Sequence, residues 1–219
     1  MRKTTIHIFI LLFTASVLIS SCKKDIDVIP FNISGFFTAN TDSKAHIYKL
    51  TDDMGNIYNV KDDDLIMFYN SKTMKYDMAY DTAIRVVATV YAEDNGKYVI
   101  ASKAIPISGE APDYLPESKK GRDPIKLKSI YIGGGHLNII IGLMTENEQI
   151  KHDLSYMVKN NSEHIRFKLY HNADGDKPVY TKDIYLSIPL AVHNIQKNDT
   201  VLFSYKSFEG DCVEKLVYR

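Results

Sequence analysis

The chain has 219 residues, of which 25% are charged, and its 27 basic side chains balance its 27 acidic ones. Without a basic excess it lacks the charge that holds nucleic acid phosphates through counterion release, so we expect no nucleic acid partner. Hydrophobic residues make up 45% of the chain, enough for packed cores, and 15 tyrosines with no tryptophan favour strands.

The N-terminal residues have the layout of a secretory signal peptide. Two basic residues precede an apolar run from Ile6 to Ile19, and Ser20-Ser21-Cys22 ends it. This run is short for a membrane span. Its small-small-Cys ending resembles the lipobox of bacterial lipoproteins, in which signal peptidase II cuts before the cysteine and the thiol carries a diacylglycerol. We therefore interpret residues 1–21 as a signal peptide and Cys22 as the lipidated first residue of the mature chain.

Residues 22–30 read as a short polar tether that ends in Pro30. Its Lys23-Lys24-Asp25-Ile26-Asp27 resembles the charged export signal of Bacteroidetes surface lipoproteins. The sequence thus predicts an outer membrane lipoprotein, on the cell surface or the periplasmic face, held to the membrane by its N-terminal lipid. Because the lipid occupies Cys22, Cys212 has no disulfide partner, and we interpret it as a half-buried small residue.

Residues 31–110 are interpreted as a first domain of about five strands, enough for a small barrel. Asp and Gly in Thr51–Gly55 favour a hairpin, and Asn95-Gly96 favours a second one, since both central positions of a type I′ turn need a positive φ. The strands are expected at Phe31–Thr38, His46–Leu50, Asn56–Lys61, Leu65–Tyr69, Ile84–Tyr91 and Lys97–Ile105. Asp62-Asp63-Asp64 has oxygen ligands of the kind that calcium prefers, but a solvated turn is favoured.

Residues 111–124 are interpreted as an interdomain linker, because Pro112, Pro116 and Pro124 punctuate it and Glu117–Asp123 is charged and free of apolar residues. Its Lys119, Lys120 and Arg122 are interpreted as a solvated loop rather than an anion site.

Residues 125–219 are interpreted as a second domain, an antiparallel β-sandwich of about seven short strands. In His164–His171 the residues Ile165, Phe167 and Leu169 should face inward and Arg166, Lys168 and Tyr170 outward. Gly133-Gly134-Gly135 predicts a sharp bend or bulge before a strand that opens at His136. The other strands are expected at Lys126–Ile132, His136–Leu143, Lys151–Val158, Tyr180–Ile188, Thr200–Ser207 and Val213–Tyr218, with a helical turn in Pro189–Gln196.

One cluster has a metal-like composition, namely His171, Asn172, Asp174 and Asp176, but Asp-Gly at a hairpin tip explains it without a metal. His136, His152 and His164 fall on separate elements at no recognised zinc spacing. Nucleophile, metalloprotease and phosphate-loop motifs are missing from the sequence. We therefore expect no cofactor and no catalytic activity.

Several stretches together carry a resemblance to one family. They are Lys49–Asn56, Arg85-Val86-Val87, Tyr131 with His136–Ile139, Lys151–Leu154, Ile165–Asn172 and Gly175-Asp176. With the lipobox, they resemble the NigD-like lipoproteins of Bacteroidetes. The resemblance implies an all-β chain with an N-terminal OB-type barrel followed by a C-terminal β-sandwich, and it brings no catalytic residue to transfer.

The leading functional hypothesis is a non-catalytic envelope lipoprotein whose β-domains bind a protein or glycan partner. Tyr58, Tyr69, Tyr91 and Tyr98 could stack on sugars, although cross-strand pairing explains such tyrosines more simply. The family name suggests bacteriocin immunity as the alternative, and an envelope hydrolase is the least favoured hypothesis.

Overall fold

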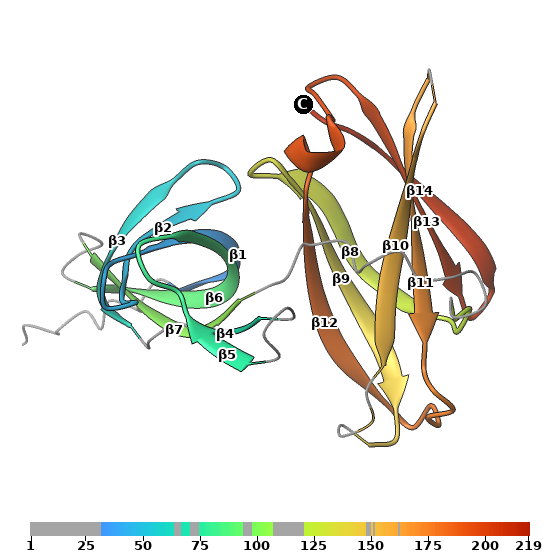
Figure 1. Cartoon of the computed structure of the whole chain (residues 1–219), viewed down its shortest axis with the longest axis horizontal. Helices are drawn as coiled ribbons and strands as arrows, with labels where there is room; N and C mark the ends of the chain where they lie inside the picture. The colour runs from blue at the N-terminus through green and yellow to red at the C-terminus, as the bar shows by residue number, and fades with distance from the viewer. Residues whose placement is uncertain are drawn as a thin grey trace, which may run out of the picture. The chain divides into compact units, whose positions relative to one another are not determined.

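The computed structural model describes residues 32–63, 67–70, 75–93, 98–106, 121–147, 150, 152–161 and 163–219 (Figure 1). The signal peptide and Cys22, most of the predicted linker and the Asn95-Gly96 turn lie outside the described residues. The strands are β1 (Asn32–Thr41), β2 (Ile47–Asp52), β3 (Ile57–Asp63), β4 (Met67–Asn70), β5 (Lys75–Met78), β6 (Ala83–Glu93), β7 (Tyr98–Pro106), β8 (Lys126–Gly133), β9 (His136–Thr145), β10 (Asp153–Asn160), β11 (Ile165–Asn172), β12 (Tyr180–Pro189), β13 (Thr200–Ser207) and β14 (Gly210–Val217).

The first set of strands closes into a barrel with the order β1-β2-β3-β7-β6, because β6 pairs back onto β1. The β3–β7 pair is parallel and the other pairs are antiparallel. This is the strand order of an OB fold, with the β4–β5 hairpin inserted between its third and fourth strands. The predicted barrel is therefore confirmed. β4 overlaps the predicted strand Leu65–Tyr69, whereas β5 was not predicted.

Every second side chain of a strand points into the barrel and fills its interior. Val86, Ala88 and Val90 point inward and are at most 1% exposed, together with Phe37 and Leu50. Asp52 forms the predicted hairpin: its Oδ1 accepts the backbone N–H groups of Met54 (2.9 Å) and Asn56 (2.8 Å), and Gly55 takes a φ of +88°. The side chain therefore stabilises the turn in the way expected of an Asx residue.

The second set of strands forms two sheets, β10-β11-β13-β14 and β12-β9-β8, packed over one core (Figure 1). All pairs are antiparallel except β11–β13, because the chain crosses to the other sheet as β12 before it returns. Ile165, Phe167 and Leu169 lie in the core, as predicted. Tyr170 faces outward, as predicted, yet it is only 5% exposed.

The triple glycine is a hairpin turn. β8 ends at Gly133 and β9 begins at His136, while Gly134 and Gly135 have φ of +57° and +76°, as a tight primed turn requires. A Cβ on Gly134 would lie 2.6 Å from Asp53 Oδ1. The predicted bend is correct, and close approach to the β2–β3 hairpin explains why a glycine stands there.

Residues 32–219 form one compact unit. Within it, the barrel and the sandwich share a polar cluster that we call the clamp: Asp53, Arg85, Tyr131, Asn138 and Ser187. Arg85 pairs with Asp53 and also donates to Asn138 Oδ1 (3.0 Å) and Ser187 Oγ (3.1 Å). Tyr131 (2.7 Å) and Asn138 (2.9 Å) donate to Asp53 Oδ2. Arg85 alternates with the inward-facing Val86 on β6, but it is only 8% exposed because the sandwich covers it.

Candidate functional site

The candidate site lies where β11 and β13 separate. These parallel strands pair from Ile165↔Val201 to Lys168↔Ser204 and no further. Beyond that point the segment Gly121–Asp123 runs beside β11: Arg122 forms a bridge with His171, and the N–H of Asp123 donates to the carbonyl of His171 (2.9 Å). A Cβ on Gly121 would collide with that carbonyl, so this approach requires glycine.

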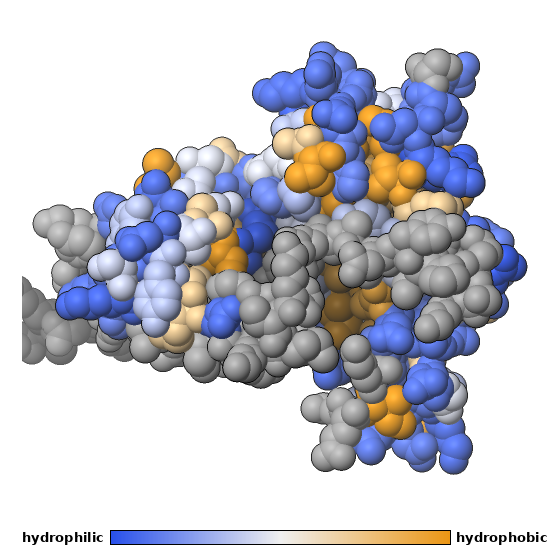
Figure 2. Space-filling view, viewed as in Figure 1, coloured by the Kyte–Doolittle hydropathy of each residue, from blue (hydrophilic) through white to orange (hydrophobic). Residues whose placement is uncertain are grey.

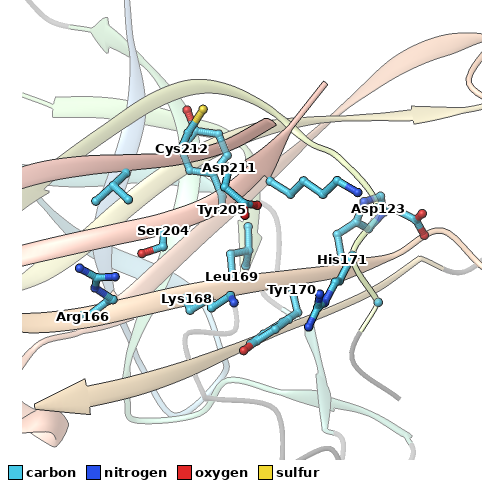
Figure 3. Close-up of a pocket in the computed structure, with 14 residues that line it drawn as sticks. Asp123, Arg166, Lys168, Leu169, Tyr170, His171, Ser204, Tyr205, Asp211 and Cys212 are labelled. Carbon is cyan, nitrogen blue, oxygen red and sulfur yellow. The ribbon is translucent and has the colours of Figure 1, made fainter. Parts of the chain in front are cut away.

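A pocket of about 210 Å³ opens at this divergence (Figure 3). Four basic side chains line it: Arg122, Arg166, Lys168 and Lys206. Two carboxylates, Asp123 and Asp211, also line it, so the formal balance is positive. Asp123 is already engaged, because its Oδ2 accepts the N–H of Ala173 (2.7 Å).

The basic residues of the pocket belong to a larger basic surface on the outward face of the four-stranded sheet. Cross-strand register places Lys159, Arg166, Leu202 and Lys215 in one row across it, and Lys168 and Lys206 lie on the same face. We call the five basic residues of these strands the basic face: Lys159, Arg166, Lys168, Lys206 and Lys215. All five are exposed, and none forms an ion pair with any residue that the structure describes.

Ser204 lies beneath these side chains, next to Arg166 and Lys168 of β11 (Figure 3). It is 8% exposed, and among the described residues its Oγ is the one buried side-chain polar atom without a hydrogen-bond partner. A buried hydroxyl normally has a partner, because losing water without one is costly. The pocket therefore contains an unused hydrogen-bonding group.

Cys212 also lines the pocket. It is half-buried, as predicted, with its Sγ 3.4 Å from Ser207 Oγ and 3.8 Å from the carbonyl of Gly210. Burial and the neighbouring Cys212 raise the pKa of Tyr205 to about 12, so this phenol stays neutral. These contacts are those of a structural thiol.

Two histidines that the sequence placed on separate elements stack behind the pocket. His152 and His171 have ring centroids 5.0 Å apart, and His152 Nδ1 lies 2.9 Å from His171 Nε2. His152 Nε2 lies 2.9 Å from Asp176 Oδ2, and His171 Nδ1 lies 3.3 Å from the carbonyl of Pro124. Antiparallel pairing of β10 with β11 brings His152, just before β10, near the end of β11.

The histidine pair is linked to a buried carboxylate, because His152 Nε2 contacts Asp176. Hydrogen bonds from Thr145, then His152, lower the pKa of Asp176 to about 2, despite burial. Burial, then the neighbouring His152, lowers the pKa of His171.

The metal-like cluster does not assemble. Asp174 is exposed in a turn with a φ of +51°, and its N–H donates to Asn172 Oδ1 (3.1 Å), while Asp176 turns inward to His152. Within the described ranges, no group of three or more His, Cys, Asp or Glu side chains is placed to hold a metal ion. Asp64 and the side chains of Asp62 and Asp63 lie outside the described residues.

Of the four tyrosines proposed for sugar stacking, the structure describes the side chains of Tyr58 and Tyr91. Tyr58 is half-buried and donates to Asp52 Oδ2 (3.1 Å), whereas Tyr91 is 37% exposed. The side chains of Tyr69 and Tyr98 lie outside the described residues. None of the helices in the part of the chain that the structure describes has the length and hydrophobicity needed to cross a membrane.

The strand pairing defines a two-part all-β protein, an OB-type barrel followed by a β-sandwich. Residues 106–218 match the NigD-like C-terminal beta sandwich domain. The chain therefore belongs to the NigD-like family, as its sequence motifs indicated. No curated protein matches it.

Solved structures share this fold. A NigD-like immunity protein from Bacteroides caccae superposes with a TM-score of 0.64 at 22% identity, covering 84% of this chain and 91% of that one. A protein named as toxin-related from Parabacteroides distasonis gives 0.66 at 16% identity, covering 86% and 94%. A protein of unknown function from Bacteroides vulgatus gives 0.58 at 13% identity, covering 86% and 92%.

Proposed function

We propose that this chain is a lipid-anchored envelope protein that binds a partner without transforming it, and that the basic face is the binding surface. The carrying observation is that five exposed basic side chains share one sheet face without ion pairs among the described residues. Such a surface attracts an acidic partner, a protein or an anionic glycan. In the view of Figure 2, hydrophilic residues separate the hydrophobic ones of the described surface, which favours polar recognition.

Crosslinking in cells tests the surface. A photoreactive residue replaces Val213, which is 53% exposed on the basic face, or Lys182 on β12 of the other sheet as the control. We expect one crosslinked product from position 213 and none from position 182, and its loss when Arg166→Glu and Lys215→Glu are added. Equal products from both positions would contradict the assignment of the face, and turnover of a cell-wall substrate by the purified protein would contradict the non-catalytic proposal.

Immunity is the second candidate, because a relative with the same fold is named an immunity protein. In that case the partner is a toxin peptide encoded nearby. Cells that express the chain should survive the peptide, and cells with the Arg166→Glu, Lys215→Glu variant should not. Equal survival without the chain would exclude this role.

The anchor is proposed on the lipobox alone. Burying an acyl chain contributes about 0.8 kcal/mol per methylene, so two or more chains hold a protein firmly. Cys22→Ala should move the protein from the membrane pellet to the soluble periplasmic fraction of a Gram-negative host, with Cys212→Ala as the control. A Cys22→Ala protein that stays in the pellet would contradict the lipid anchor.

A further inference from the structure

We propose that the pocket at the divergence of β11 and β13 binds a compact tetrahedral oxyanion of the phosphate or sulfate class. The pocket is defined by its lining and by the unpartnered Ser204 hydroxyl within it. At about 210 Å³ it is smaller than the ~300–1,000 Å³ of sites for drug-sized ligands, so it suits one small charged group.

The donors come from three separate segments. Arg122 belongs to the segment before β8, Arg166 and Lys168 to β11, and Ser204 and Lys206 to β13. A tetrahedral oxyanion presents oxygens in several directions and can accept from all three segments, whereas a carboxylate offers two coplanar oxygens.

The carboxylates of the lining leave a positive surplus. Asp123 is held by Ala173, and Asp211 stands opposite Lys206 in the β13–β14 register, so it offsets about one charge. Lys168 lies over the Tyr170 ring, with its Nζ 5.2 Å from the ring centroid. This contact holds the ammonium beside the pocket.

The pocket is a smaller site within the basic face, and ion binding in the pocket is a separate proposal from partner binding over the whole basic face. A free ion needs only the pocket, whereas a macromolecule also needs outlying residues such as Lys159 and Lys215. Arg166, Lys168 and Lys206 belong to both the pocket and the basic face, whereas Ser204 belongs to the pocket alone, so the variants below include Ser204→Ala. Loss of ion binding would leave the crosslinking result unaffected, and the two proposals can fail separately.

The test titrates the folded protein with inorganic phosphate, sulfate and acetate at neutral pH and low salt, followed by backbone amide NMR shifts. We expect saturable shifts centred on Lys168, Ser204 and Lys206, with phosphate and sulfate bound more tightly than acetate. Lys168→Gln should weaken phosphate binding about tenfold and Ser204→Ala several-fold. Lys182→Gln on the other sheet should change nothing.

Vesicles separate the two sources of the group. If the phosphate group belongs to a lipid, protein without its anchor should bind vesicles of phosphatidylcholine and phosphatidic acid but not vesicles of phosphatidylcholine alone. The Lys168→Gln variant should not bind either kind of vesicle. Binding of inorganic phosphate without binding of either vesicle assigns a free ion. Shifts that do not saturate, acetate bound as tightly as phosphate, or affinity unchanged in both Lys168→Gln and Ser204→Ala would overturn the proposal.

Discussion

At the residue scale, Ser204 and Ser187 are expected to have opposite effects on the free energy of unfolding. Both are buried, but Ser187 accepts from Arg85 and donates to Asn138 (2.6 Å), while Ser204 Oγ has no partner among the described residues. A buried hydrogen-bonding group stabilises only when it is paired. These two serines therefore form a matched pair for experiment.

Ser204→Ala should raise the free energy of unfolding by about 1 kcal/mol, because it removes an unsatisfied hydroxyl. Ser187→Ala should lower it by about 1–2 kcal/mol, because the Arg85 Nε–H loses its acceptor and Asn138 Oδ1 loses one of its donors. Urea denaturation measures both. A loss of stability in Ser204→Ala would mean that the hydroxyl is satisfied in solution.

The burial of His171 leads us to expect that the free energy of unfolding depends on pH. Burial and His152 lower its pKa in the folded state, so below about 6.5 the unfolded chain takes up a proton that the folded chain resists. The free energy of unfolding should therefore fall as pH decreases from 7 towards the folded pKa, by at most about 1.4 kcal/mol per pH unit. Asp123, His152 and, beyond it, Asp176 are the titratable groups nearest to this ring.

His171→Gln should make this slope shallower. It should not abolish it, because burial also lowers the pKa of His136 and His193. His46→Gln, at an exposed position, is the control for the loss of an imidazole. Denaturation at several pH values decides the matter, and a His171→Gln slope equal to the parent's would contradict the predicted role.

At the element scale, the two glycines of the β8–β9 turn allow the cost of backbone strain to be measured separately from the cost of a steric clash. Gly134 and Gly135 both have positive φ, but only a Cβ on Gly134 meets Asp53; at Gly135 the nearest atom is the Tyr218 hydroxyl at 4.0 Å. Gly135→Ala should cost about 1 kcal/mol of strain. Gly134→Ala should cost about 2–3 kcal/mol, since the clash with Asp53 adds to the strain. Equal losses would show that the contact with the β2–β3 hairpin contributes nothing.

Alternation predicted the elements because one face of each sheet is buried. Ile165, Phe167 and Leu169 repeat with period two, and all three lie in the core. Arg85 follows the same rule and lies on the outward face of its strand, but no local pattern shows that another part of the chain covers that face. The sequence did not predict the histidine pair or the pocket for a related reason. His152 and His171, like Lys168 and Ser204, are brought together only by the register in which their strands pair.

At the scale of the whole molecule, the clamp joins two separate cores. Arg85→Met should lower the free energy of unfolding by about 3–5 kcal/mol, because the carboxylate of Asp53, 12% exposed, loses its counter-charge. Lys128→Met removes one partner of the exposed Lys128–Asp183 ion pair, whose side chains are 36% and 39% exposed, and should cost less than about 1 kcal/mol.

Denaturant titrations followed by separate probes in the barrel and the sandwich measure both effects. In Arg85→Met the two parts should unfold at different denaturant concentrations, while Lys128→Met retains one coincident transition. Equal losses in the two variants, or coincident transitions in both, would contradict a coupling role for the clamp.

The crossover between β11 and β13 has a consequence for the order in which this chain is made. β11 leaves the ribosome before its neighbour β13, which follows only after β12 has joined the other sheet. Until β13 and β14 emerge, one edge of β11 carries unpaired N–H and C=O groups and the core lacks Val201 and Phe203. The sandwich can therefore complete its core only after β13 and β14 have been made, and until then the open edge of β11 can pair with a strand of another chain.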